Sequence, residues 1–365
     1  MRLVAALSGG VDSSVAAARM VDAGHEVVGV HLALARSSSS GRQRGCCTLD
    51  DARDARRVAD VLGVPFYVWD FSDRFAETVM ADFLDEYGQG RTPNPCLRCN
   101  EHIKFSAVLD RALALGFEGI ITGHYARLGQ ASDGPELRRA IDDSKDQSYV
   151  LAVVPREKLA AAHFPLGGDC KEDVRREAGE RGLITATKPD SHDICFVSDG
   201  DTAGYLVTAL GEAPGPIVDS QTGERIGEHR GTFTVTIGQR RGLGLQVPAA
   251  DGQPRYVVDV DKESAVVSVG PREELLVRRI ETGAPEWWTH AWSGAREGVH
   301  VQVRAHGEPV PARVLASEGG LIAELLEPIQ GIAPGQALVV YQDDRVLAAA
   351  TIEATDRVRG TRARA

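Results

Sequence analysis

The alternation of short apolar runs with helical patterns in the N-terminal part constrains the fold of this chain most strongly. Strands are predicted at residues 3–7, 25–34, 66–69 and 119–123, and helices at 13–21, at 49–62 and in a stretch that ends near Tyr87. Strands that alternate with helices form a parallel sheet covered on both faces, and ligands bind at the carboxyl ends of its strands. The sequence therefore predicts an α/β domain with a ligand site at that edge of a parallel sheet.

From Gly215 onward the pattern changes to short β-branched runs separated by glycine and proline. The runs are at residues 231–238, 255–261, 264–270, 300–307, 311–317, 321–328, 337–342 and 345–353. Regularly spaced strands of this kind predict a small central β-rich domain followed by a β-barrel. We therefore expect an α/β domain over residues 1–200, a central domain over 201–272 and a C-terminal β-barrel domain over 273–365, with a loose basic tail from Arg357.

Charge and cysteine content limit the kind of protein this is. A formal net charge of -11 argues against non-specific binding of nucleic acid, which relies on summed positive charge, but it leaves room for a local basic surface. Six cysteines in 365 residues do not make a secreted disulfide framework, so they indicate metal binding or catalysis in a reducing compartment. The sequence shows no signal peptide and no membrane-spanning run, so we expect a cytoplasmic protein.

The segment Ser8 to Ser14, SGGVDSS, lies between the first predicted strand and the first predicted helix. Its glycines let the backbone approach a ligand, and the helix N-terminus presents N–H groups to anionic oxygen. It lacks the Gly-Lys-Ser/Thr of a Walker P-loop, whose lysine reaches the β and γ phosphates. The segment resembles instead the PP-loop of enzymes that split ATP between the α and β phosphates. The alternative is a glycine turn that only joins a strand to a helix.

A second motif spans residues 90–105 and contains Cys96 and Cys99. Two prolines stiffen the loop, and Asn100 is predicted to cap the helix that follows. Cys99 would then lie near a helix N-terminus among cations, where the thiolate is favoured. By itself the pair fits half of a structural zinc site equally well, although the sequence has no second CxxC or HxxxH to complete one.

A third motif, residues 188–196, carries Cys195 in a polar loop. Taken alone this cysteine is best explained as a packing residue, but beside the other two motifs we expect it to have a chemical role.

His124 follows a predicted strand and is expected in the active site; the alternative is a histidine packed in the core. The remaining interpretations are loop or packing roles for Cys46 and Cys47, a structural role for Cys170, barrel packing for Trp287, Trp288 and Trp292, and contact with an RNA backbone for Arg240 and Arg241.

Six motifs occur in the order seen in one protein family. They are SGGVDSS, GRTPNPC-x-x-CN-x-x-IKF, TGHYAR (122–127), KDQSYVLA (145–152), the DICF cysteine and TIGQRRGLG (236–244). With these motifs the chain resembles, over nearly its whole length, the bacterial tRNA-specific 2-thiouridylase family of PP-loop ATP pyrophosphatases. The resemblance implies an enzyme that makes 2-thiouridine at the wobble position of tRNAs for Lys, Glu and Gln, with ATP activating the C2 oxygen as an adenylate. Mg would neutralise the pyrophosphate as it departs.

The resemblance also implies roles for individual residues. ATP would contact Ala6, Leu7, Ser8, Gly9, Gly10, Val11, Asp12, Ser13, Leu32 and Gly123. The target base would contact Asn94, Pro95 and Cys96, and tRNA would contact Lys145, Asp146, Gln147, Arg304 and Ala305. Cys99 would be the nucleophile and Cys195 the cysteine that receives sulfur as a persulfide from a partner such as a cysteine desulfurase or a sulfur-relay protein.

One departure from the family pattern leaves two mechanisms open. The family commonly has Asp at the position of Cys96. The base or orienting role given to that carboxylate therefore has no direct counterpart here. Cys96, Cys99 and Cys195 would instead supply three thiolates, a set able to hold an iron-sulfur cluster. Two further functions are kept as alternatives: a PP-loop amidotransferase or synthetase that acts on a small molecule, and a tRNA-binding or iron-sulfur protein without enzymatic activity.

Overall fold

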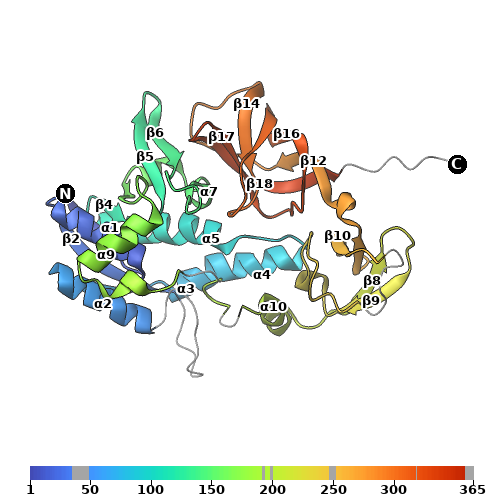
Figure 1. Cartoon of the computed structure of the whole chain (residues 1–365), viewed down its shortest axis with the longest axis horizontal. Coiled ribbons are helices and arrows are strands. Elements are labelled where there is room, and N and C mark those ends of the chain that lie inside the picture. The colour runs from blue at the N-terminus through green and yellow to red at the C-terminus, as the bar shows by residue number, and fades with distance from the viewer. Residues whose placement is uncertain (35–48, 191–193, 198–199, 246–251, 318, 358–365) are drawn as a thin grey trace.

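The structure, a computed structural model, describes residues 1–34, 49–190, 194–197, 200–245, 252–317 and 319–357. Figure 1 shows an α/β region at the N-terminal end, a β-barrel beside it, and a small β-rich region at the far end of the molecule. None of the helices within the described ranges has the length and apolar character that crossing a bilayer requires. The predictions for Cys46, Cys47 and most of the basic tail concern residues outside these ranges.

The first sheet is parallel and has the strand order β3-β2-β1-β4-β7. Its strands are β1 (Arg2–Ala6), β2 (Glu26–Ala33), β3 (Phe66–Asp70), β4 (Gly119–Ile121) and β7 (Ala162–His163). The predicted parallel sheet is thus confirmed, and four of its strands lie at the predicted places. The two-residue β7 lies in a part of the chain for which no strand was predicted.

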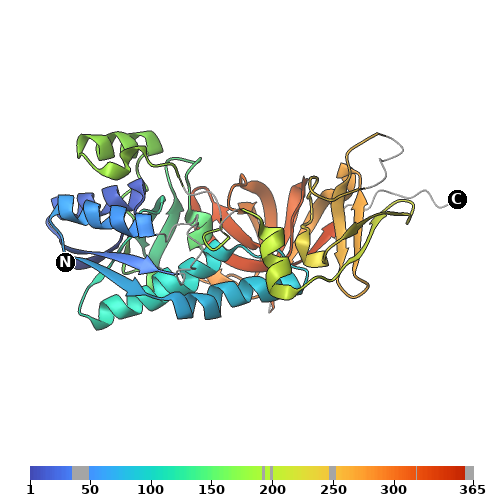
Figure 2. The same ribbon diagram turned by 90° about the horizontal axis from the view of Figure 1, so that it is seen from below.

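The central strand β1 is covered on both faces because successive side chains point to opposite sides of a sheet. Leu3 and Ala5 pack in one apolar cluster with residues of the helices α1, α2 and α9. Val4 packs in a second cluster with residues of the helical run that begins at Pro95. Figure 2 shows these layers, with helices above and below the N-terminal sheet. The helices are α1 (Val11–Asp22), α2 (Leu49–Leu62) and α9 (Lys171–Glu180) on one side and α5 (Pro95–Arg98), η2 (Cys99–Val108) and α6 (Leu109–Ala114) on the other.

The helical run from Pro95 shows that the prediction of Asn100 as the helix cap is wrong. Asn94, and not Asn100, is the N-cap: the Asn94 side chain accepts a hydrogen bond of 3.0 Å from the Cys96 N–H. Asn100 lies inside the π-helix η2, where it is buried and its amide donates to the Val150 carbonyl at 3.1 Å. The prolines start the helix earlier than expected because proline suits its first turn. Cys96, rather than Cys99, therefore occupies the first turn.

Several short elements connect the sheet to the rest of the chain. They are α3 (Ser72–Phe75), η1 (Ala76–Met80), α4 (Ala81–Gly88), α7 (Ser148–Leu151), α8 (Arg156–Leu159), η3 (Ile184–Thr187) and α10 (Thr202–Leu210). The stretch that was predicted to be helical up to about Tyr87 is helical through α4, which ends at Gly88.

The central region holds a four-stranded sheet with the order β10-β11-β8-β9. Its strands are β8 (Gly215–Asp219), β9 (Arg225–His229), β10 (Tyr256–Asp261) and β11 (Val266–Gly270). The strand predicted over residues 231–238 is wrong, since that run holds the short helix η4 (Thr232–Thr234) and no strand. Phe233 packs in an apolar cluster with Phe83 and Leu206, and this packing outweighs the β propensity of the run.

The C-terminal strands close into a barrel because the first strand, β12, also pairs with the last, β18. After η5 (Arg272–Leu275) come β12 (Leu276–Thr282), β13 (Glu286–Trp287), β14 (Gly294–Gln302), β15 (Val310–Ser317), β16 (Gly320–Gln330), β17 (Ala337–Gln342) and β18 (Arg345–Arg357). A hairpin from the N-terminal region, β5 (Ala126–Ala131) and β6 (Gly134–Arg139), continues this sheet through the pairing of Arg138 with Arg345.

Buried side chains also join the barrel to the N-terminal region. The Trp288 Nε1–H donates to the Ala152 carbonyl at 2.7 Å, and Trp288 is fully buried, as the prediction of barrel packing required. The Tyr149 hydroxyl donates to the Ala337 carbonyl at 2.9 Å. These contacts hold the barrel against α7 and its C-cap residue Ala152, and Figure 1 shows the barrel beside the N-terminal region.

Candidate functional site

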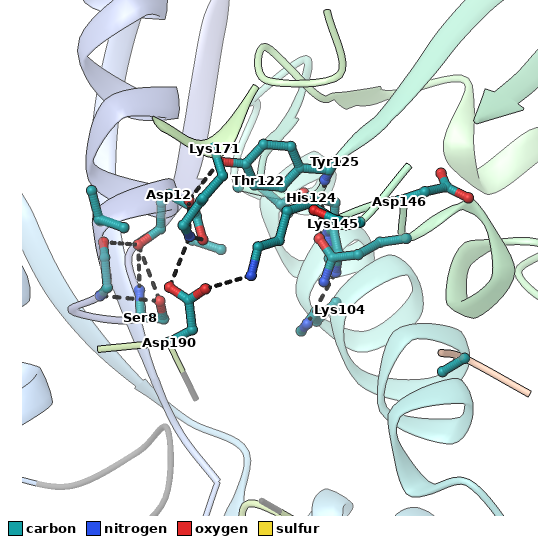
Figure 3. Close-up of a pocket in the computed structure, with 18 of the residues that line it drawn as sticks. Ser8, Asp12, Lys104, Thr122, His124, Tyr125, Lys145, Asp146, Lys171 and Asp190 are labelled. Atoms are coloured by element: carbon teal, nitrogen blue, oxygen red, sulfur yellow. Dashed lines mark hydrogen bonds and ion pairs between the residues drawn. The ribbon is translucent and has the colours of Figure 1, made fainter. Parts of the chain in front are cut away.

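A cavity of about 1180 Å³ lies at the carboxyl ends of β1, β2 and β4, the edge at which a ligand site was predicted. It is lined by residues from both the N-terminal region and the barrel (Figure 3). Of the residues assigned to ATP or tRNA from the sequence, the cavity wall contains Ala6, Leu7, Ser8, Gly10, Val11, Asp12, Ser13, Leu32, Gly123, Lys145, Asp146, Gln147 and Ala305.

The PP-loop forms one wall of this cavity. Gly10 is the N-cap residue of α1, and no side chain from the described part of the chain caps this helix, so the first N–H groups of α1 can bind a ligand. Ser8 and Ser13 face each other with their hydroxyl oxygens 3.1 Å apart. Gly9 has φ +77, and a Cβ there would lie 2.3 Å from the Asp51 carbonyl oxygen. The loop therefore requires glycine at this position, and it presents backbone and hydroxyl donors suited to phosphate.

Asp12 is held from two sides. The Lys171 ammonium lies 2.7 Å from each of its carboxylate oxygens, and the Tyr125 hydroxyl donates to one of them at 2.9 Å. Burial raises the pKa of Tyr125, and the neighbouring Asp12 charge raises it further, so this hydroxyl stays a donor. Gly123 makes room for this arrangement, since a Cβ there would lie 2.6 Å from the Ser13 nitrogen.

Asp190 is an anion placed among cations in the middle of the site (Figure 3). Its carboxylate lies 2.8 Å from the Lys145 ammonium, 2.9 Å from that of Lys171 and 2.6 Å from the Arg175 guanidinium. Burial acts to raise the pKa of Asp190, but Lys145 and Lys171 outweigh it and hold the pKa well below its usual range. The carboxylate is therefore charged and occupies a position suited to other anions.

Lys188 ties the PP-loop to helix α2. Its ammonium donates to the Gly9 carbonyl at 3.0 Å and to the carboxylates of Asp51 and Asp54 at 2.7 and 2.8 Å. Burial opposes the charged form, but the two carboxylates raise the pKa of Lys188, so it stays a cation. Sequence reasoning gave no role to Lys188, although it lies in the Cys195 motif, or to Lys171, which no local pattern marks.

The expected tRNA contacts differ in how accessible they are. The side chain of Asp146 is 3% exposed, and it accepts hydrogen bonds from the Ala140 N–H and the Ser148 hydroxyl, both at 2.8 Å. The Gln147 side chain accepts from the Tyr125 N–H at 3.0 Å. Lys145 remains partly exposed at the cavity and Arg304 is exposed on the barrel, so these two are the better placed to meet RNA.

The expected base-binding and catalytic residues are not among those that line this cavity. The lining residues within the described part of the chain do not include Asn94, Pro95, Cys96, Cys99 or Cys195. Cys99 is buried and Cys195 partly buried, and both belong to one apolar cluster, whereas Cys96 is exposed. Within the same described ranges, no three His, Cys, Asp or Glu side chains are grouped so as to hold a metal ion. The three cysteines proposed as cluster ligands are therefore not grouped as a metal site.

Two other sequence interpretations are supported by the geometry. His124 is buried and lines the cavity, with its ring between Phe105 and Phe164, so it is both packed and part of the site. Cys170 is the N-cap residue of α9, as the predicted helix start required.

Comparison with known proteins identifies the family. The model described as tRNA methyl transferase HUP domain matches residues 1–199, that of a tRNA methyl transferase PRC-barrel domain residues 203–271, and that of an aminomethyltransferase beta-barrel domain residues 277–352. Among solved structures, a 4-thiouridine synthetase bound to RNA and ATP has a TM-score of 0.35 and 16% identity over 57% of this chain and 50% of that chain, too weak a likeness to support an argument.

Curated relatives match the chain from end to end. The tRNA-specific 2-thiouridylase MnmA of Nocardioides sp. is 57% identical over 98% of this chain and 99% of the relative. The enzymes of the same name from Beutenbergia cavernae and Acidothermus cellulolyticus are 57% and 58% identical, over 98% of this chain and 96% and 99% of the relatives. The chain belongs to the tRNA-specific 2-thiouridylase family.

Proposed function

We propose that this protein is a tRNA-uridine 2-sulfurtransferase that converts the wobble uridine of tRNAs for Lys, Glu and Gln to 2-thiouridine, with AMP and pyrophosphate as the other products. The observation that carries the proposal is the PP-loop at the wall of a large cavity whose other side is formed by the barrel. Two of the matching family models are described as tRNA methyl transferase domains. The N-terminus of α1, which no described side chain caps, lies beside several lysines and suits a triphosphate, so ATP-driven thiolation is the better explanation.

In the first step of the proposed reaction, the uridine C2 oxygen attacks the α phosphorus of ATP. The bond between the α phosphorus and the bridging oxygen breaks, and pyrophosphate leaves with the electron pair. The N–H groups in the first turn of α1, with the Ser8 hydroxyl, would hold the departing pyrophosphate. Lys171 lies beside this loop and adds positive charge where negative charge is released.

In the second step, sulfur replaces the activated oxygen. The terminal sulfur of a persulfide on Cys195 attacks C2, and the C2–O bond breaks to release AMP. The Cys99 thiolate then attacks the Cys195 sulfur, which forms a disulfide between the two cysteines and leaves the terminal sulfur on the base. The presence of both cysteines in one apolar cluster supports this route. An external thiol reductant and a sulfur donor protein complete the cycle.

The described residues do not form a metal site of their own, so we assign no step to a protein-bound cluster. Mg²⁺ would enter with the triphosphate, since this ion is commonly held by substrate phosphates and its own waters. The assignment of base contacts to Asn94, Pro95 and Cys96, of tRNA contacts to Lys145 and Arg304, and of domain limits at residues 200 and 272 belongs to this proposal, as does a cytoplasmic location.

The test is to incubate unmodified tRNA with the protein, ATP, Mg²⁺ and a persulfide source and to analyse the nucleosides by mass spectrometry. We expect 2-thiouridine, together with AMP formation that depends on tRNA. AMP formation that needs a small molecule instead of tRNA would favour a synthetase, and tRNA binding without turnover would favour a binding protein. Absence of 2-thiouridine under both aerobic and anaerobic conditions would contradict the proposal.

A further inference from the structure

Lys104 links the nucleotide cavity to the helix of Cys99. It lines the cavity and lies in the π-helix η2, five residues after Cys99. In a π-helix the N–H of residue i+5 bonds the carbonyl of residue i, so residues five apart lie one turn above each other. In a regular α-helix the same spacing would turn Lys104 away from the face of Cys99.

A neutral histidine holds the Lys104 side chain in place. The Lys104 nitrogen lies 3.3 Å from His124 Nε2, and the Thr122 hydroxyl lies 2.7 Å from His124 Nδ1 (Figure 3). An ammonium group can only donate, so Nε2 must accept and the ring proton must sit on Nδ1, facing Thr122. Burial lowers the pKa of His124 well below its usual range, and the Lys104 charge lowers it further.

The packing around His124 makes this orientation rigid. Its ring lies 5.7 Å from the Phe105 ring and 5.8 Å from the Phe164 ring, measured between centroids, and 7% of the residue is exposed. Thr122 is also buried. A buried, tautomerically defined imidazole is a suitable device for fixing a flexible lysine because it cannot rotate to satisfy another partner.

Lys104 also differs from the other cations of the cavity in its charge balance. Among the lining residues that the structure describes, each other Lys or Arg lies within ion-pair distance of a carboxylate. These pairs are Arg139 with Asp143 and Asp146, Lys145 with Asp190, Lys171 with Asp12 and Asp190, and Lys188 with Asp51 and Asp54. Within the described part of the chain, Lys104 has the neutral His124 as its polar partner and no carboxylate within ion-pair distance, so its positive charge is available to a substrate anion.

We propose that Lys104 is a further catalytic residue, which donates a hydrogen bond to the oxygen atoms at the junction of the ATP α-phosphate and the uridine C2 oxygen, and that His124 is its positioning residue. This inference rests on the proposed function. As the uridine C2 oxygen adds to the α phosphorus, negative charge increases on the α-phosphate oxygens, and when sulfur attacks C2, the electron pair of the C2–O bond moves onto AMP. Lys104 stabilises both changes as a fixed cation and transfers no proton.

The experiment compares Lys104→Met, Lys104→Arg and His124→Phe with the wild type, and uses Lys262→Met, at an exposed lysine after β10, as the matched control. AMP formation and 2-thiouridine are measured with saturating tRNA over a range of ATP concentrations. We expect Lys104→Met to lower kcat about 100-fold while KM for ATP changes by less than about threefold, since the contact strengthens in the transition state. Lys104→Arg should retain more activity than Lys104→Met.

His124→Phe keeps the ring volume but removes the acceptor, so kcat should fall about tenfold. His124→Gln, whose amide oxygen accepts, should recover part of that loss. Thermal unfolding of each variant reports whether it folds. The proposal is overturned if a folded Lys104→Met protein has the same kcat as the wild type, or if the substitution changes only KM for ATP. A wild type that makes no 2-thiouridine would instead overturn the proposed function, which keeps the two failures distinct.

Discussion

Lys171 donates to both carboxylate oxygens of Asp12, with both distances 2.7 Å, although the two residues are 159 positions apart in the chain. The same ammonium lies 2.9 Å from Asp190, so one buried lysine connects the PP-loop to the segment that leads to Cys195. The structure thereby joins two motifs that the sequence presents as separate.

This contact predicts that Lys171→Met lowers pyrophosphate release at least tenfold and raises KM for ATP, because the variant loses positive charge beside the PP-loop. Asp12→Ala should also lose turnover. The products of the remaining activity should be AMP and pyrophosphate, as expected for a loop without a Walker lysine. Arg176→Met, at an exposed position of the same helix α9, is the control. ADP and phosphate as products would be the contrary result.

The barrel contact at Trp288 should contribute to the stability of the whole chain. Trp288→Phe removes the donor to the Ala152 carbonyl and leaves a buried acceptor without its partner, so the free energy of unfolding should fall by about 1–3 kcal/mol. Urea unfolding measures this change. Trp292→Phe is a matched control, since the Trp292 Nε1–H is buried without a hydrogen-bond partner among the described residues. Equal losses for the two variants would argue against the role of the Trp288 hydrogen bond.

His124 should make the folded protein sensitive to mild acid. Its pKa is lowered in the folded state, so the unfolded chain binds more protons once the pH falls below the unfolded value of about 6.5. The contribution of the neutral His124 to the free energy of unfolding is fully present above that pH. It is lost as the pH falls toward the folded pKa, by at most about 1.4 kcal/mol per pH unit. In His124→Phe this component should disappear. Chemical denaturation of both proteins between neutral and acidic pH checks the difference; parallel curves would contradict it.

Lys145 and Arg304 should act on tRNA affinity through local charge. Replacing either by Ala should weaken tRNA binding and reduce the salt slope by about one, while ATP binding to the Arg304→Ala variant stays unchanged. Filter binding or fluorescence titration over a range of salt concentrations provides the measurement. Arg225→Ala, at an exposed position of the central sheet, is the control. A slope that neither variant changes would remove both residues from the interface.

Cys96 distinguishes the persulfide route from an iron-sulfur route. If Cys99 and Cys195 act through persulfide and disulfide chemistry, Cys96→Asp should keep wild-type activity without iron. If three thiolates hold a cluster, the same change replaces a soft ligand with a hard one and should weaken iron binding. Anaerobic reconstitution with iron and sulfide, visible absorbance and the thiolation assay give the answer. We expect full activity in iron-free Cys96→Asp protein, and strict dependence on reconstituted iron would refute the mechanism proposed above.

Local patterns in the sequence predicted the N-terminal sheet, helix α2 and the glycine turn of the PP-loop, because each depends on neighbouring residues. The apolar runs that became β1 and β2 are buried on both faces, and the helix predicted at 49–62 has the bounds of α2, Leu49–Leu62. Gly9 adopts a positive φ that favours glycine, which a strand-turn-helix pattern indicates without any tertiary information.

The tertiary structure decided which residues that are far apart in the chain come into contact. Local propensity predicted a strand over residues 231–238, but the burial of Phe233 against Phe83 outweighs it. The pairing of Arg138 with Arg345 continues the barrel sheet into the N-terminal region, and the cavity wall includes Ala305 from the barrel. The ion pair of Lys171 with Asp12 has the same origin. Such contacts depend on how whole sheets and helices assemble, and no short-range periodicity encodes that assembly.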